Sequence, residues 1–240
     1  MSVSEQHVQA VVQSCRDRLG DPAGWVPPDE YRDSLALCII ESVQAAGNRY
    51  ADAGTVVDRY RAYRRARVPG RITDGARELL RTFEEVGSSD QWAGKIGSYK
   101  RRYSEQAAPM RAAEIQRTAE SLHALHIDSV GDLVGATRDD RRRRDLRAAW
   151  DECCGGPDDA MWQHLLTLAG APGSAATAAT ATDEFVRSAL ADTPGGSTPS
   201  APPAEMLAAA AGRLGVSAAA LEHAVRRWHC TREDHFHPVA

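Results

Sequence analysis

The sequence predicts an all-α fold made of many short amphipathic helices. Apolar residues recur three and four positions apart along most of the 240 residues. No segment of strand length alternates apolar and polar residues, and no stretch has the uninterrupted apolar length of a membrane span. A chain of this length can bury a substantial core, as one large domain or as two small ones.

Helix boundaries follow from the residues that stop or start a helical pattern. Gly20 and Pro22 end the first apolar pattern, and Asp29 after "WVPP" (25–28) is suited to cap the next. The segment "VPGR" (68–71) ends another. Helices are therefore expected over 4–19, 31–47, 52–67, 73–86, 89–97, 109–125, 128–136, 141–153, 160–169, 183–191, 203–211 and 217–229.

Two segments interrupt this rhythm. Residues 170–183 are small and polar, and 192–205 are rich in proline, glycine and serine, so both are expected to be linkers. We expect two helical subdomains with a cleft between them. The first is a helical barrel over 34–159, and the second combines 1–33 with 160–240.

Positive charge is concentrated in three places, although the net charge is −4. The segment 59–71 holds six arginines and no acid, 99–103 reads "YKRRY", and the arginines of 138–147 are partly neutralised by three aspartates. Such clusters suit local contacts with a phosphate backbone, whereas arginine runs are more often solvated helix faces. The candidate DNA contacts in the first two clusters are Arg64, Arg65, Arg101 and Arg102.

The N-terminus lacks the basic and apolar regions of a signal peptide, so a cytoplasmic protein is expected. The five cysteines show no framework spacing, which agrees with a reducing compartment. The histidines of "WHCTREDHFH" (228–237) match no zinc spacing, and no metal is expected.

The most informative segment is "LRAAWDECCGGPDDAMWQHLLTLAG" (146–170). One helix ends near Cys153, a glycine–proline turn follows, and a second helix opens near Asp158. A helix–turn–helix of this kind can present backbone N–H groups to a DNA phosphate, and glycine allows the close approach. Any pair of antiparallel helices gives a similar pattern.

In the order of its features, the chain over roughly 30–190 resembles the helix-hairpin-helix (HhH-GPD) DNA glycosylase superfamily. "LALCIIESVQAAGNRY" (35–50) is similar to the family's first core helix, "RAAEIQRTAESLHAL" (111–125) to the segment before the hairpin, and "CGGPDDAMWQHLLTLAG" (154–170) to the hairpin and its second helix. Within the superfamily, the chain is similar to a bacterial group that removes glucosylated hydroxymethylcytosine from phage DNA.

The resemblance implies roles for individual residues. Gln44 falls at the glutamine that wedges into the duplex, and Gly155, Gly156 and Asp158 fall in the DNA-binding hairpin. Asp183 falls at the catalytic aspartate, which stabilises the oxocarbenium-like sugar and can activate water. Asp183 could equally be a helix N-cap, and both roles can hold at once. The candidate base-pocket aromatics, which could also be core residues, are Tyr50, Trp150 and Trp162.

Asp159 stands where lyase members of the family carry a lysine, which implies base removal without strand cleavage. The hairpin reads "GGPD" where the family usually has "PGVG", and the loop before Asp183 is longer than usual. The cysteine set of an iron–sulfur cluster is missing, so no cofactor is expected.

The predicted function is therefore a monofunctional DNA N-glycosylase that acts, as a monomer, on double-stranded DNA with modified bases. Two alternatives stay open. One is a DNA-binding module of the same fold without chemistry, and the other is a helical interaction protein unrelated to DNA.

Overall fold

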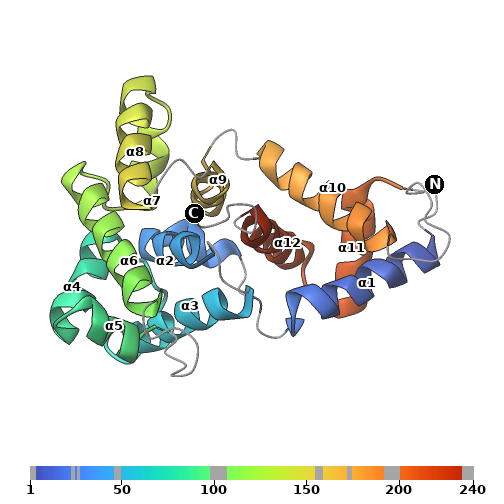
Figure 1. The fold of residues 1–240 in the computed structure, drawn as a ribbon, viewed down its shortest axis with the longest axis horizontal. Helices are drawn as coiled ribbons and strands as arrows, with labels where there is room; N and C mark the ends of the chain where they lie inside the picture. Colours follow the sequence, from blue (N-terminus) through green and yellow to red (C-terminus); the bar gives the residue numbers. More distant parts are fainter. Residues whose placement is uncertain are drawn as a thin grey trace, which may run out of the picture.

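The chain folds into helices only, as expected from its sequence, in a computed structural model that describes residues 4–22, 25, 28–45, 50–97, 107–154, 159–171, 175–191 and 201–233 (Figure 1). Within these residues there is no strand. The helices are α1 (Glu5–Leu19), the 3₁₀ helix η2 (Pro28–Asp33), α2 (Leu35–Ala45), α3 (Tyr50–Arg65), α4 (Ala76–Val86), α5 (Ser89–Lys95), α6 (Ala107–Ala124), α7 (Val130–Ala136), α8 (Asp140–Cys153), α9 (Asp159–Ala169), α10 (Ala175–Ala191), α11 (Pro203–Leu214) and α12 (Ala218–Glu233).

Two hydrophobic cores organise these helices. The first is formed by η2 and α2 to α9, and the second by α1, α10, α11 and α12. Helices α1, α10 and α11 lie at one end of the molecule in Figure 1, while α12 lies beside α2 and α9 and contacts both. Helix α12, which also contacts η2 and α3, makes most of the contacts between the two cores, and α10 adds a smaller contact with α9.

The expected division of the chain is wrong for two elements. Helix α9 and Tyr31 of η2 belong to the first core, although 160–240 and 1–33 were assigned to the second subdomain. Met161, Trp162 and Leu165 of α9 are buried there, and α9 packs along α2. The boundary after the first core therefore lies beyond Ala171, not at residue 159.

Helix α10 begins earlier than its sequence suggests. The segment 170–183 was expected to be a linker, but Ala175–Ala191 is one helix. Alanine has the highest intrinsic helix propensity, and buried Ala181 and Phe185 anchor this helix in the second core. Asp183 consequently lies in the middle of α10 and does not open it.

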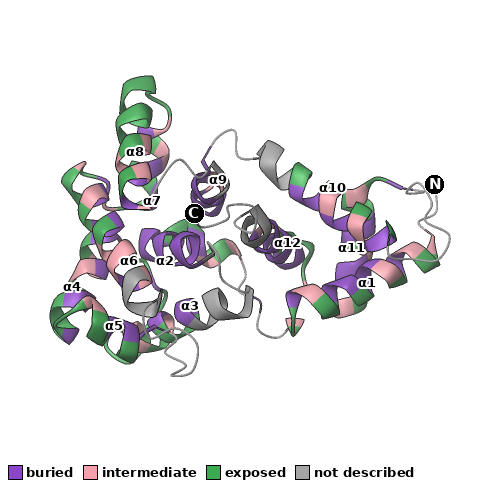
Figure 2. Cartoon of the chain, in the orientation of Figure 1, coloured by how far each residue is buried: buried purple, intermediate pink, exposed green. Residues whose placement is uncertain are grey.

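The expected helix 31–47 is divided at Ser34. The Ser34 hydroxyl accepts a hydrogen bond from the backbone N–H of Leu37 at 3.3 Å and donates to the carbonyl of Asp74 at 2.9 Å. Such a serine caps a helix N-terminus. Helix α2 therefore starts at Leu35, and every residue from Ser34 to Gln44 is buried (Figure 2).

A helix that crosses a membrane has to be both long enough and apolar enough to span the bilayer. No single helix of the described residues can cross a bilayer, although α11 and α12, bent by 112°, meet those two criteria when taken together.

Gly75 permits a close contact between α4 and the residues before α7. The N–H of Ala76 donates to the carbonyl of Asp128 at 3.2 Å, and a Cβ on Gly75 would lie 1.7 Å from that oxygen. Backbone must shift to accommodate alanine, and such overpacking costs about 1–3 kcal/mol. We expect Gly75→Ala to lower the free energy of unfolding by about this amount in urea titrations.

Gly94 of α5 is the matched control, since a Cβ there meets no atom within 4 Å. Gly94→Ala should raise stability, because alanine is favoured over glycine in a helix by up to about 1 kcal/mol. Equal effects of the two substitutions would contradict the close contact at Gly75.

Candidate nucleic-acid interface

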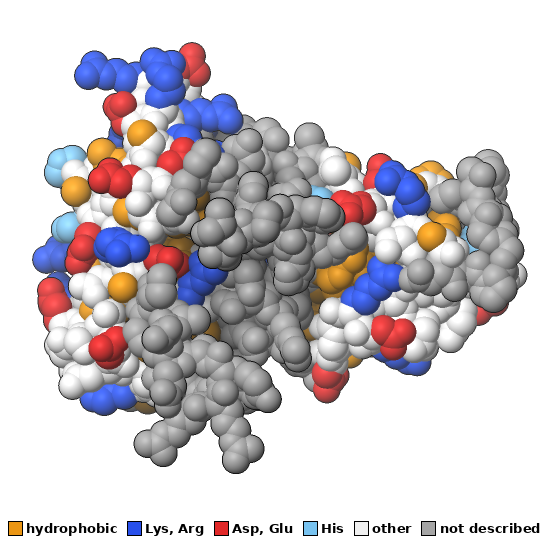
Figure 3. All heavy atoms as spheres, viewed as in Figure 1, with side chains coloured by type: hydrophobic (Ala, Val, Ile, Leu, Met, Phe, Trp, Pro, Cys, Tyr) orange, Lys and Arg blue, Asp and Glu red, His pale blue; other side chains and the backbone are white. Residues whose placement is uncertain are grey.

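Helix α8 is amphipathic in a way that leaves its arginines in solvent. Asp139 caps its N-terminus by accepting a hydrogen bond from the N–H of Arg142 at 2.8 Å. Leu146, Trp150 and Cys153 are the buried residues of the helix, at helical spacing. The remaining positions of the first turns are polar, and α8 carries an exposed band of positive charge at the top of the view in Figure 3.

The arginines at 141–144 form this band, which we call the α8 arginine row. All four are exposed, and none makes an ion pair or side-chain hydrogen bond with a described residue. The row therefore presents an excess of positive charge, which Asp139, Asp140 and Asp145 offset only in part, and a surface that binds polyanions needs such an excess.

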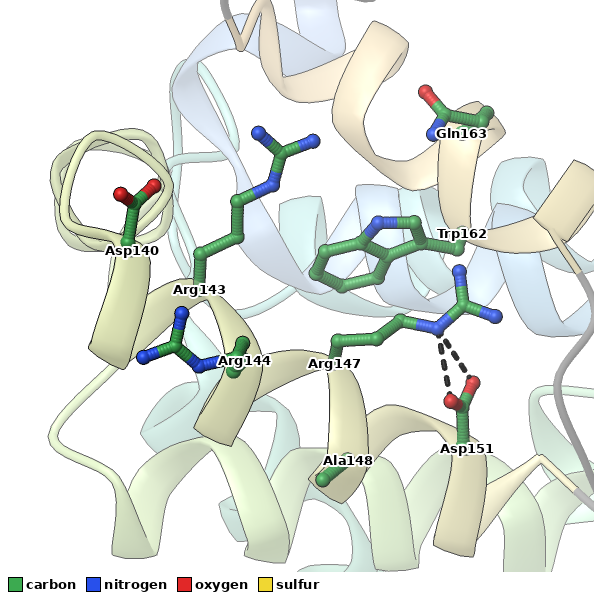
Figure 4. Close-up of a pocket in the computed structure, with 8 residues that line it drawn as sticks. All are labelled: Asp140, Arg143, Arg144, Arg147, Ala148, Asp151, Trp162 and Gln163. Carbon is green, nitrogen blue, oxygen red and sulfur yellow. Dashed lines mark hydrogen bonds and ion pairs between the residues drawn. The ribbon is translucent and has the colours of Figure 1, made fainter.

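A hollow of about 470 Å³ lies between α8 and α9, and Figure 4 shows the residues that line it. The α8 residues at its wall are spaced along one helix face, and α9 contributes an aromatic ring and an amide. The lining residues are Asp140, Arg143, Arg144, Arg147, Ala148, Asp151, Trp162 and Gln163.

Arg147 is held against the wall of this hollow. Its Nε donates to both carboxylate oxygens of Asp151, at 2.8 and 2.9 Å, and its guanidinium carbon lies 5.7 Å from the centre of the Trp162 ring. The Trp162 ring packs in turn on Trp150, with 6.1 Å between ring centres. Charged side chains of α8 thus line one side of the hollow, and Trp162 and Trp150 of the first core lie beneath it.

The arginines of 59–71 are used differently. Arg64 forms a two-pronged ion pair with Asp74, with Nε–Oδ2 at 2.6 Å and Nη2–Oδ1 at 3.0 Å. Its side chain is 12% exposed. The expectation that Arg64 contacts DNA is therefore not supported, because Asp74 neutralises its charge and fixes α3 to the segment before α4.

Its neighbours are also paired with acids. Arg65 lies 3.7 Å from Glu30 and is half exposed, and Arg67 lies 3.5 Å from Glu85. The segment has no acid of its own, but the fold supplies acids from other elements. Arg65 is the more accessible of the two DNA contacts predicted in this segment.

Asp183 is exposed on α10 and makes no hydrogen bond or ion pair with a described residue. The N-cap role is excluded by its place eight residues into the helix. Its carboxylate is accessible to a substrate, which is what the catalytic assignment requires and does not by itself establish.

Gln44 is buried near the end of α2, with 8% of its surface exposed. A residue that wedges into a duplex has to project from the surface, so Gln44 does not stand where that role needs it. Trp150 is likewise a core residue, 1% exposed. Of the predicted base-pocket aromatics, Trp162 lines the hollow.

Several predicted site residues lie outside what the structure describes. They are Gly155, Gly156 and Asp158 of the turn, Arg101 and Arg102, and the side chain of Tyr50. In the described part of the chain no group of three or more histidines, cysteines and acids could hold a metal ion.

A fully buried polar cluster lies at the junction of the two cores and was not among the sites predicted from the sequence. We call it the Glu41 cluster. The Glu41 carboxylate accepts a hydrogen bond from the Tyr31 hydroxyl and lies 2.9 Å from Arg227 Nε and 2.9 Å from His223 Nε2. His164 Nε2 lies 3.4 Å away. The five residues come from η2, α2, α9 and α12, so the cluster joins all elements that meet there.

The charges of the cluster balance with both histidines neutral. Burial raises the pKa of Glu41, but Arg227 and the two histidines outweigh this effect and hold it well below the usual value. Burial lowers the pKa of His164 to about 4, although the hydrogen bond to Glu41 opposes this, and it lowers the pKa of His223 for the same reason. At neutral pH the cluster is therefore one carboxylate paired with one guanidinium.

A signal for this cluster exists in the sequence. Glu41 is the one charged residue of the apolar segment 35–44, and a buried charge needs a partner. Its partners, however, are 123 to 186 positions further along the chain, too distant for any local pattern to indicate them. The cluster is closed to solvent, so its role is structural.

Thiol chemistry is disfavoured at the cysteine next to the turn. Burial raises the pKa of Cys154 to about 12, so the thiol is protonated at neutral pH and is a poor nucleophile.

Residues 9–232 match the family described as Domain of unknown function (DUF8548), and the chain belongs to that family. No curated protein and no solved structure matches the chain.

Proposed function

We propose that the protein binds DNA along α8 and along residues 155–158, for which the sequence predicts a turn, without reading the DNA sequence. The observation that carries this proposal is the α8 arginine row, in which four exposed guanidinium groups have no carboxylate partner among the described residues. Phosphate contacts by arginines and by the N-terminus of a helix after a tight turn supply most of the affinity of non-specific DNA binding.

The resemblance of the sequence to helix-hairpin-helix glycosylases extends the proposal to a reaction. The protein acts as a monofunctional DNA N-glycosylase on a modified base, with glucosylated hydroxymethylcytosine of phage DNA as the leading substrate and anti-phage defence as the role. The two helical subdomains would bound the DNA-binding cleft. The base would be turned out of the stack before its removal.

Asp183 is the proposed catalytic group, supported by its exposure on α10. As the bond from C1′ to the base nitrogen breaks, the sugar gains positive charge, which a carboxylate stabilises. The bonding electrons leave with the base, which takes up a proton from solvent, and water adds at C1′ while Asp183 accepts one of its protons. With Asp159 where lyases have a lysine, the strand stays intact.

The test is incubation with a panel of modified duplexes, including glucosylated phage DNA, followed by alkaline cleavage at abasic sites. We expect cleavage with the wild type and none with Asp183→Asn, while DNA affinity is kept. Glu205→Gln, which removes another exposed carboxylate of the same subdomain, is the control and should keep full activity.

The outcomes separate the candidate functions. Abasic sites made by Asp183→Asn at the wild-type rate would exclude Asp183 as the catalytic group. DNA binding without abasic sites on any substrate would favour the alternative, a non-catalytic DNA-binding module. A folded protein that binds no DNA at low salt would contradict the proposal as a whole.

A further inference from the structure

We infer that the hollow between α8 and α9 binds one phosphodiester of a DNA strand, with the adjoining deoxyribose against Trp162. We call this binding site the phosphate seat. The inference rests on the proposed DNA-binding function. It adds the place at which a phosphate binds and the number of phosphates bound there, which is one. The charge, the size and the lining of the hollow support it.

The charge of the lining fits one phosphodiester. Three guanidinium groups face two carboxylates, of Asp140 and Asp151, which leaves one positive charge in excess. A phosphodiester carries one negative charge. Arg143 and Arg144 are the cations of the lining that have no carboxylate partner among the described residues, so they are the groups that would bind the phosphate.

The size of the hollow calls for more than a phosphate group. At about 470 Å³ it falls within the range of sites for small organic ligands, which begins at ~300 Å³. Ala148 and the small accessible part of Trp162, which is 3% exposed, provide the apolar part of the wall. Gln163 provides an amide that can donate or accept. A sugar attached to a phosphate presents this combination of apolar and polar surface.

The position of the hollow fits a strand that also reaches the turn. Asp151 lies two residues before the end of α8, and Trp162 lies in the first turn of α9. The lining therefore reaches toward both helix ends that flank residues 155–158. An acidic protein segment is the other polyanion that could bind arginines, but it has no sugar to place against Trp162.

The seat can be tested by the salt dependence of DNA affinity, because each phosphate contact contributes about 0.9 to the slope of log K against log salt. One seat holds one phosphate. We therefore expect Arg143→Ala, Arg144→Ala and the double variant each to lower the slope by about one, with no further loss in the double. The probe is a 20-base-pair duplex of mixed sequence, measured by fluorescence anisotropy.

Arg141→Ala is the matched control on the same helix, since Arg141 is exposed but does not line the hollow. When Arg141→Ala is combined with the double variant, the decrease in the slope of log K against log salt should be the sum of the two separate decreases. A loss of about two in Arg143→Ala/Arg144→Ala would mean two independent phosphates and would overturn the single seat. An unchanged slope would overturn the seat and leave DNA binding standing, whereas a wild type that binds no DNA removes the proposed function first.

Trp162 gives a second readout that does not depend on charge. DNA should quench the tryptophan fluorescence of the wild type, and Trp162→Phe should lose this quenching while it still binds DNA. A poly-glutamate peptide that displaces DNA at equal charge concentration and quenches Trp162 equally would show that the hollow accepts any polyanion, which contradicts a nucleotide seat.

Discussion

Glu41→Ala is expected to be the most destabilising single substitution in the described core. It removes the carboxylate on which the buried groups of α9, α12 and η2 converge, and with it the acid that lies 2.9 Å from the 1% exposed side chain of Arg227. Breaking a buried ion pair by removing one partner costs about 3–5 kcal/mol, because the remaining charge stays out of water. Urea unfolding followed by circular dichroism should show a loss of this size.

The exposed ion pair between Glu5 and Arg213 is the control for this experiment. Arg213 Nη2 lies 2.5 Å from Glu5 Oε2, so its contact is as close as those in the Glu41 cluster. Both residues of this pair stand in solvent, where ion pairs contribute little. Glu5→Ala should leave the urea midpoint close to that of the wild type.

The double variant Glu41→Ala/Arg227→Ala distinguishes charge from packing. If the loss in Glu41→Ala comes from breaking the ion pair with Arg227, removing Arg227 as well should cost less than the sum of the two single substitutions. Strict additivity would show that Arg227 and Glu41 do not interact and would contradict the cluster.

The second large effect is a loss of stability in mild acid. His164 has a pKa of about 4 in the folded protein, against 6.5 ordinarily, so between these values the unfolded chain binds a proton that the folded chain does not. Stability therefore rises with pH through this window, and it is lost as the pH falls from 6.5 towards 4. His164 alone accounts for about 3 kcal/mol, at 1.36 kcal/mol for each pKa unit.

The other groups of the cluster act in the same direction. The lowered pKa of His223 adds to the loss, and the lowered pKa of Glu41 extends it below 4.5, where the carboxylate begins to take up a proton in the unfolded chain. Arg227 and the neighbouring Arg226 stay charged throughout and disfavour a charged His223.

The measurement is the free energy of unfolding from urea titrations at pH values from 4 to 7. His164→Phe should flatten the curve between pH 6.5 and 4. A wild-type curve that is flat over this range would contradict neutral, buried histidines.

The sequence was sufficient to predict the helices but not how they associate. Local patterns predicted the boundaries of α8 and α9 closely, because capping and apolar spacing are local properties. They failed at α10, where small polar residues suggested a linker and alanine propensity prevailed. They also assigned α9 to the wrong core, since core membership depends on contacts between distant residues.

The candidate interface shows the same limit. The arginines of 59–71 and 138–147 look alike in sequence, but the fold brings Glu30, Asp74 and Glu85 to the first group. Among the described residues, no acid from another element pairs with the row at 141–144. Composition identified both clusters, and only the three-dimensional arrangement of the acids separates them.

That separation is the central claim, and the salt dependence of DNA affinity in two triple variants tests it most directly. One variant removes Arg141, Arg143 and Arg144 of α8, and the other removes Arg65, Arg67 and Arg71, each of which lies within 4 Å of a carboxylate. Both change the net charge equally. We predict that the α8 variant loses about two from the slope of log K against log salt and that the other keeps the wild-type slope. Equal slopes in the two variants would contradict the account.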